Sequence, residues 1–466
     1  MQDLARTLGP AKLVALVIAA AAPLSCLLGT VPLLFAFGTG AAAPFTFVAS
    51  TVVLLLFSVG YAEISRHVTG GGALYTYVAR GLGPAWGLGA AFVAVVAYLI
   101  FDLGCYAYTG YFIQIMVRDI TGFDLSWVWW MALSGVTIGV LGYRQLDVST
   151  RVIIVLLTFE FGLLFVFDAA ILIHKGFAAF TPMIFDRSVV HGGSVSIGLM
   201  FAFLCYIGFE SAAIYSEEVT APTRSVPIAL YAAVGTLGAF YIATTWLTIG
   251  LVGVANIRPL ALQDPALLYF RLNTLVVGRV GTHLLEVFMT TSQLITTLAL
   301  HNAATRYLFS LGRQRCFPAR LGAVHTSHQS PHIASLATSV MTVVPALILG
   351  LAGVPPIVGL GSITTALGTI GILLLQALAA VAVVFYFLRR RTLHWWKTGV
   401  APGLAALGLG AAACFAIHDF AFLSGTTLPG MSLLPWTPVV AFAVGFIFAL
   451  WARRNHPYLH AQLSRP

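Results

Sequence analysis

The sequence has few charged residues. Asp, Glu, Lys and Arg make up 8% of its 466 residues, whereas a soluble domain carries about 25%. Such a chain has too few polar groups for a water-facing surface, which excludes an ordinary soluble enzyme. The sequence also lacks the G-x-S-x-G, H-E-x-x-H and G-x-x-x-x-G-K-[ST] motifs, so nothing indicates a serine hydrolase, a zinc peptidase or an ATP-driven pump.

Cysteine is scarce as well, with five residues in the whole chain. Their number is odd, they lie within or beside apolar segments, and their spacing is not that of metal ligands. They are Cys26, Cys105, Cys205, Cys316 and Cys414. We therefore expect no disulfide framework, no metal and no cofactor.

Apolar residues are abundant and make up 59% of the sequence. Apolar runs of about 20 residues, the length of a helix that crosses a bilayer, recur along the chain and leave no room for a large domain outside the lipid. We expect a single all-α integral membrane domain over residues 1–466 with twelve transmembrane helices. The predicted spans are 12–38, 43–66, 84–117, 126–143, 149–173, 194–217, 226–253, 282–311, 333–352, 356–388, 399–418 and 433–452.

The basic residues indicate how these spans are oriented. If the N-terminus is cytoplasmic, 18 of the 24 Lys and Arg residues fall on the cytoplasmic side. The other face then holds Arg118, Lys175, Arg187, Arg258, Arg271 and Arg279. The positive-inside rule predicts that both termini are cytoplasmic, in a multi-pass protein of the cell membrane. Because the basic residues lie in short gaps between spans rather than on one surface, no nucleic acid is expected as a partner.

Two spans contain residues that interrupt a helix. Residues 22–32, APLSCLLGTVP, combine two prolines with a glycine, and residues 203–211, FLCYIGFES, place a glycine beside a carboxylate. Non-helical backbone inside a membrane is tolerated where it faces protein or a water-filled cavity. Interruptions at matching places in two five-helix halves are typical of inverted-repeat transporters, which bind substrate at the broken helices. The alternative for each break is a kink that serves packing.

Three motifs accompany these breaks in a fixed order. Residues 70–77 read GGGALYTY, residues 208–227 contain GFESA and EEVTAPTRSVP, and residues 302–313 read NAATRYLFSLGR, followed by Phe317-Pro318. These segments resemble the signatures after helix 2, in helix 6 and at the end of helix 8 of the amino acid–polyamine–organocation (APC) permeases. The resemblance implies alternating access around a central site in a 5+5 inverted-repeat fold. The first repeat is expected over 12–173, the second over 194–388, and two additional helices over 399–452.

The breaks and the resemblance together predict the site residues. Substrate contacts are expected from Pro23, Ser25, Cys26, Gly29, Thr30, Asp102, Leu204, Cys205, Tyr206 and Gly208, and gating from Phe203, Tyr206 and Phe209.

Two departures from the family pattern bear on the substrate. Residues 23–29 stand where many amino acid permeases have a G-S-G-I-F-like element, and Leu204 stands where several have a bulky aromatic gate. The proline at the first break resembles the pattern of a divergent branch of the family, which includes putrescine importers.

Three acidic residues within spans are candidates for function, because a bare charge at mid-membrane costs at least about 2.5 kcal/mol. Glu210 directly follows the second break and is predicted to take up and release the coupling proton, with a structural carboxylate as the alternative. Glu160 lies where proton-coupled relatives often hold a Lys; we expect either coupling or helix pairing. Asp102 shares one helix face with Tyr98 and Tyr106, which suits a substrate ammonium, or it pairs with another helix.

The predicted function is therefore secondary active transport of an amino acid or related amine, with proton-coupled import favoured. The partners are a small-molecule substrate, a proton and the lipid bilayer, with the oligomeric state left open. A polyamine importer and an amino acid or amine exchanger remain alternatives within transport. Outside transport, the alternatives are an intramembrane enzyme and a nutrient sensor that does not transport.

Overall fold

A computed structural model of the chain describes residues 9–68, 73–144, 150–185, 193–212, 219–326, 329–392, 394–421 and 431–455. Every element in these ranges is helical, which confirms the all-α prediction. Two parts of the motifs named above, residues 70–72 and 217–218, lie outside the described residues.

Most of the helices overlap the predicted spans. They are α1 (Pro10–Ala20), α2 (Pro23–Gly29), α3 (Val31–Phe37), α4 (Ala43–Ser65), α5 (Ala73–Leu82), α6 (Pro84–Thr121), α7 (Trp127–Tyr143), α8 (Thr150–Lys175), α9 (Val195–Leu204), α10 (Pro222–Val252), α11 (Ile257–Gln263), α12 (Leu268–Val276), α13 (Arg279–Arg313), α14 (His332–Leu351), α15 (Ser362–Arg389), α16 (Ala401–His418) and α18 (Thr437–Asn455).

Ten helical stretches among the described residues are long and apolar enough to cross a membrane. Of the two other predicted spans, α7 has only 17 residues, and α13 is long but rich in threonine and other polar side chains. The count of twelve therefore stays a prediction. The chain also forms three short helices that the spans did not include, namely α5, α11 and α12. They have seven to ten residues, too few turns for an apolar period to stand out in the sequence.

The outer helices expose apolar side chains, as lipid contact requires. In the most apolar 18-residue stretch of the helical segment that begins with α8, only 22% is buried inside the protein. Leu133 on α7, Leu407 on α16 and Ile447 on α18 are likewise exposed. Large apolar surfaces of this kind are rare in water and mark a membrane-facing or partner-facing surface. The chain is therefore a multi-pass membrane protein.

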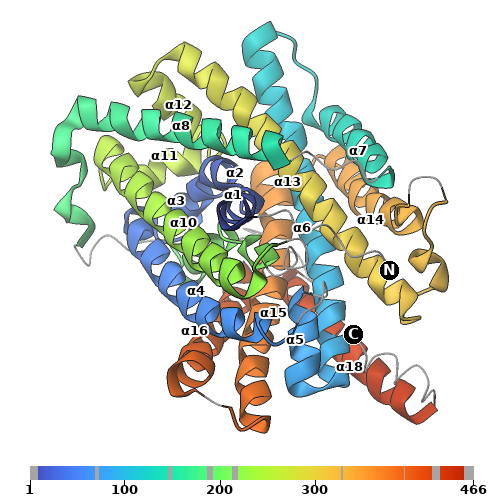
Figure 1. Ribbon diagram of the computed structural model, residues 1–466. Coiled ribbons are helices and arrows are strands. Elements are labelled where there is room, and N and C mark those ends of the chain that lie inside the picture. The colour runs from blue at the N-terminus through green and yellow to red at the C-terminus, as the bar shows by residue number, and fades with distance from the viewer. Residues whose placement is uncertain are drawn as a thin grey trace.

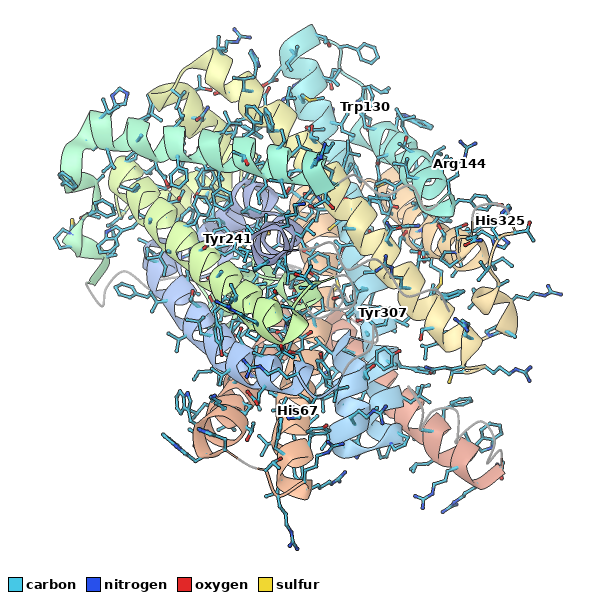
Figure 2. All side chains as sticks on the ribbon, viewed as in Figure 1. His67, Trp130, Arg144, Tyr241, Tyr307 and His325 are labelled. Carbon is cyan, nitrogen blue, oxygen red and sulfur yellow. The ribbon has the colours of Figure 1, made fainter. Side chains whose placement is uncertain are left out.

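The interrupted first span lies at the centre of the bundle. In Figure 1, α1 and α2 are seen in the middle of the view, with α8 and α10 on one side and α6 and α13 on the other. α1 packs on α8 and α10, and α2 packs on α8 and α13. Tyr241 of α10 lies near these central helices (Figure 2). Four further helices, α6, α7, α13 and α14, pack against one another and are called the scaffold group below.

A hydrogen-bonded cluster joins α9 to the end of α16. Ser194, the N-cap of α9, accepts a hydrogen bond from the Ile197 amide at 3.2 Å and donates one to Asp419 at 2.8 Å. Ser196 also donates to Asp419, as does His418, whose Nδ1 lies 2.7 Å from Oδ1. The hydrogen bond from Ser196 is the main cause that holds the pKa of Asp419 below its ordinary value, and those from His418 and Ser194 add to it. The charged form of Asp419 therefore stabilises the folded state.

Replacing Asp419 with Asn is expected to lower the free energy of unfolding by about 1 kcal/mol at neutral pH, because it removes charge-assisted hydrogen bonds. The folded pKa is depressed, so this contribution is complete above the unfolded value of about 4 and disappears as pH falls through the lower folded value. Thermal unfolding of the detergent-purified protein across this range tests it. Equal melting temperatures at neutral pH would contradict the prediction.

Candidate functional site

The first span is interrupted just before Pro23. α1 ends at Ala20, and Ala22 adopts a left-handed conformation with φ of 47° before α2 begins. Such a conformation costs a residue with a side chain about 1–2 kcal/mol, and Pro23 has no amide hydrogen to continue the helix. A second irregularity at Thr30 separates α2 from α3. The prolines and the glycine of this segment therefore divide the span as the sequence predicts.

The second interruption follows α9. This helix ends at Leu204, residues 205–208 form a turn, and residues 209–212 form a single 3₁₀ turn. Gly208 has φ of 112°, a conformation that side-chain-bearing residues rarely adopt. The predicted break at 203–211 is therefore present.

The two interruptions touch each other through backbone atoms. A Cβ atom on Gly208 would lie 2.4 Å from the Ala20 carbonyl oxygen and 3.0 Å from the Ala21 amide nitrogen. Only glycine fits this contact, for reasons of space as well as backbone conformation. Gly208 and Cys26 both remain partly exposed among buried neighbours.

Glu210 closes the second break. Its side chain folds back so that Oε2 accepts a hydrogen bond from the Gly208 amide at 3.0 Å, and Oε1 accepts one from the Tyr98 hydroxyl at 3.0 Å. The Tyr61 hydroxyl donates to the Glu210 carbonyl oxygen at 2.9 Å. The carboxylate is 3% exposed. It thus satisfies a backbone amide that the break leaves free.

Glu160 has the same relation to the first break. From α8 its carboxylate interacts with the Ser292 hydroxyl and with the amide of Leu24, in the first turn of α2. Ser292 on α13 also receives a hydrogen bond from Ser25 at 3.2 Å. The carboxylate of Glu160 therefore links three helices at the interrupted span.

The other predicted contact residues divide into two sets. The first set faces the breaks: the Cys26 thiol donates to the Ala21 carbonyl oxygen at 3.4 Å and interacts with the Cys205 thiol. Gly29 faces Phe112 and Met289. The remaining members of this set are buried, at the start of α2, at the α2–α3 junction and at the end of α9: Pro23, Thr30, Phe203 and Leu204.

The second set faces α4. The Tyr206 hydroxyl lies 2.7 Å from Thr51 Oγ1, and Phe209 packs edge-on against Phe57 with ring centroids 5.9 Å apart. Both rings therefore contact α4, and gating by them stays a prediction.

Asp102 lies in a different cluster from Glu210. Its Oδ2 atom lies 3.9 Å from Nδ1 of His301 on α13. Of its two predicted aromatic neighbours, Tyr106 contacts His301, whereas Tyr98 contacts Glu210. A shared helix face did not predict a shared partner, since the helices packed on α6 differ from one turn to the next. Tyr61, Tyr98 and Ser292 were missed as partners because they come from other spans and carry no local sequence signal.

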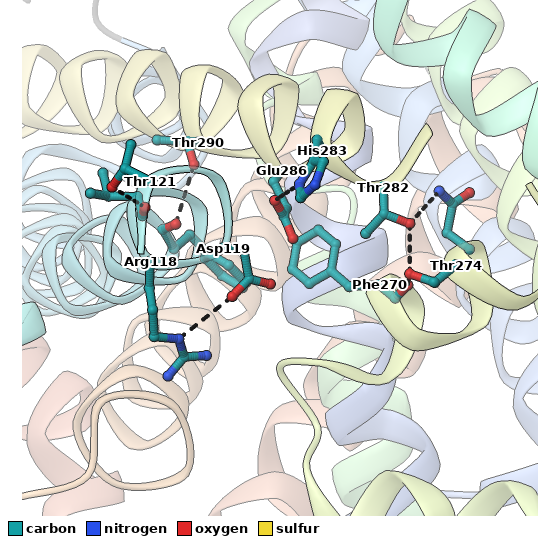
Figure 3. A network of polar contacts seen from close by, with 12 residues as sticks. Arg118, Asp119, Thr121, Phe270, Thr274, Thr282, His283, Glu286 and Thr290 are labelled. Carbon is teal, nitrogen blue, oxygen red and sulfur yellow. Dashed lines mark hydrogen bonds and ion pairs between the residues drawn. The ribbon is translucent and has the colours of Figure 1, made fainter. Parts of the chain in front are cut away.

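A further polar network lies where α6 ends and α13 begins (Figure 3). Glu286 Oε2 lies 3.2 Å from His283 Nδ1, and Arg118 pairs with Asp119 at 3.5 Å. At the C-terminal end of α4, Arg66 lies 3.5 Å from Glu63 and neutralises it.

Comparison with known proteins adds the following. The family model described as amino acid permease matches residues 8–452. The branched-chain amino acid permease BcaP of Bacillus subtilis (strain 168) is 22% identical, over 92% of this chain and 89% of its own length. The uncharacterized amino acid permease YecA of the same organism is 25% identical, over 65% of this chain and 62% of its own length.

Replacing Gly208 with Ala is expected to lower the free energy of unfolding by about 2–4 kcal/mol, through backbone strain and overpacking against Ala20. Thermal unfolding in detergent measures the effect. Gly235→Ala is the matched control, because a Cβ there meets nothing within 4 Å. If both variants melted at the wild-type temperature, the contact between the breaks would not be required.

Proposed function

This chain belongs to the amino acid permease family, and from this premise we propose that it imports an amino acid across the cytoplasmic membrane, driven by proton entry. It is a transporter and not an enzyme. In the proposed orientation both termini are cytoplasmic, and the halves 12–173 and 194–388 each contribute one broken helix. Alternating access opens the broken helices to one side of the membrane and then to the other.

The observation that carries the coupling proposal is the pairing of one carboxylate with each break. The Glu160 carboxylate interacts with the Leu24 amide, and Glu210 accepts a hydrogen bond from the Gly208 amide. A carboxylate binds such amides more strongly than a neutral carboxyl does. Proton binding therefore loosens the bond and frees a backbone donor at the break. Deprotonation restores the interaction. The backbone geometry at each break therefore depends on the protonation state of its carboxyl group.

The same pairing favours a zwitterionic amino acid over a polyamine. At the breaks, a polyamine would need carboxylates that remain free to bind its ammonium groups, yet the carboxyl groups of Glu160 and Glu210 both interact with the protein's own donors. An amino acid instead brings a carboxylate for which a released amide is a ready donor. The substrate we propose has an apolar side chain, as in the branched-chain amino acids that the name of BcaP gives as its cargo.

Uptake into proteoliposomes under an imposed pH gradient tests the proposed function. We expect labelled leucine, isoleucine or valine to accumulate when the outside is acidic, and their methyl esters and decarboxylated amines to compete poorly. Efficient competition by putrescine and by the amines, with none by the amino acids, would favour the polyamine alternative. Strict one-for-one exchange without net accumulation would favour the exchanger, and chemical conversion without net movement would overturn transport.

Glu210→Gln is expected to reduce proton-driven uptake at least about tenfold, since the coupling proton loses its carrier. Substrate exchange, which needs no net proton movement, should fall much less. Glu63→Gln is the control, because Glu63 pairs with Arg66 at the edge of the protein and contributes little. Equal losses of uptake and exchange in Glu210→Gln would assign Glu210 to structure and not to coupling.

A further inference from the structure

One buried carboxylate belongs to neither break. Asp102, on α6 in the scaffold group, is 0% exposed, and neither of its oxygens has a hydrogen-bond partner among the described residues. An ionised carboxylate in this environment is destabilising, because it has lost its hydration and has no hydrogen bond that compensates for the loss. Such a carboxylate is therefore expected to take up a ligand that removes its charge.

The group best placed to supply that ligand is the imidazole of His301, which is itself fully buried. Its Nδ1 lies 3.9 Å from Asp102 Oδ2 and 3.4 Å from the Tyr106 hydroxyl. Its Nε2 lies 3.1 Å from Ser335 Oγ on α14. Since a hydroxyl both donates and accepts, Ser335 can serve either tautomer. The ring is therefore held at Nε2 while Nδ1 faces the carboxylate.

The packing leaves room for this arrangement at one place on α7. A Cβ atom on Gly142 would lie 2.9 Å from Cδ2 and Nε2 of His301 and 2.9 Å from Ser335 Oγ. The glycine thus allows the imidazole and the hydroxyl to approach α7. All four helices of the scaffold group contribute to the site.

Among the residues that the structure describes, none next to the pair supplies a compensating charge. The titratable groups facing it are Cys105 and Tyr106 on α6, both neutral at neutral pH. α14 adds Thr342, which lies near Tyr106, and α15 adds Thr364 and Thr365 beside Gly104. The charged residues of the scaffold group lie toward the helix ends: Arg118, Asp119, Arg144, Arg279, Glu286, Arg306 and Arg313.

We propose that Asp102 and His301 together bind one proton, as a protonation site separate from Glu160 and Glu210. Without the proton, the pair consists of a carboxylate and a neutral imidazole, with a charge of −1. The added proton comes from water, resides on Nδ1 or on the carboxyl group, and brings the charge to zero. Burying the pair costs less desolvation free energy when its net charge is zero. The proton therefore stabilises the contact of α6 with α13 and α14. The proposal requires neither a particular substrate nor transport itself.

Infrared difference spectroscopy on the full-length protein in detergent tests it, by stepping from about pH 8 to about pH 5, the range in which histidine changes charge. Wild-type protein is expected to show a carboxyl or imidazole change that Glu210→Gln and Glu160→Gln leave in place. Asp102→Asn and His301→Gln should each remove it. Because one proton is shared, the double variant should lose no more than either single variant. Additive losses, or wild-type spectra for both single variants, would overturn the proposal.

Two further variants separate proton binding from a structural effect. Gly142→Ala pushes a methyl group against His301 and is expected to alter the same signal, whereas Gly162→Ala, with nothing within 4 Å, should not. Ser335→Ala keeps the pair but removes the hydroxyl at Nε2, and should shift the pH of the transition without abolishing it. An unshifted transition in both Gly142→Ala and Ser335→Ala would exclude this site. If the wild-type protein showed the infrared signal but no amino acid uptake, only the proposed transport function would be contradicted.

Discussion

The arrangement of the centre depends on one contact, the backbone of Gly208 against the backbone of Ala20 and Ala21. Two helices that approach this closely cannot both remain helical and also leave room for side chains between them. Each is therefore interrupted, and each interruption exposes backbone groups that the bilayer cannot hydrate. Glu210 and Glu160 have positions that follow from this need. The centre of the protein is polar because its backbone is broken there.

The buried carboxylates differ in what they bind. Glu210 and Glu160 both interact with backbone amides and hydroxyl groups, so that their charge is stabilised by the interrupted helices. Asp102 lies between intact helices, whose amides are already used, and has no such donor. A buried carboxylate therefore finds hydrogen-bond donors at a break in a helix, but not between two regular helices. The interrupted helices are the part of the fold that can accommodate a charge without a counterion.

Much of this could be read from the sequence. The all-α membrane fold and both breaks depend on composition or on residues close together in the sequence, and these predictions are confirmed. The partners of Glu210 and Glu160 could not be read, because Tyr98, Ser292 and Leu24 come from other spans. Nor did the sequence show that the Tyr206 ring turns toward α4. Contacts between distant spans depend on helix rotation, which a uniformly apolar segment does not specify.

The pairing of carboxylates with breaks has a consequence for biosynthesis. Leu24 and its acceptor Glu160 both belong to residues 12–173, and Gly208 and its acceptor Glu210 are two positions apart. Each half of the chain thus contains the acid that caps its own interruption. As the ribosome delivers the spans in order, Glu160 can reach the Leu24 amide before the second half has been made, and Ser292 joins them later. The nascent chain then need not hold an uncapped break in the lipid while it waits for the rest of the protein.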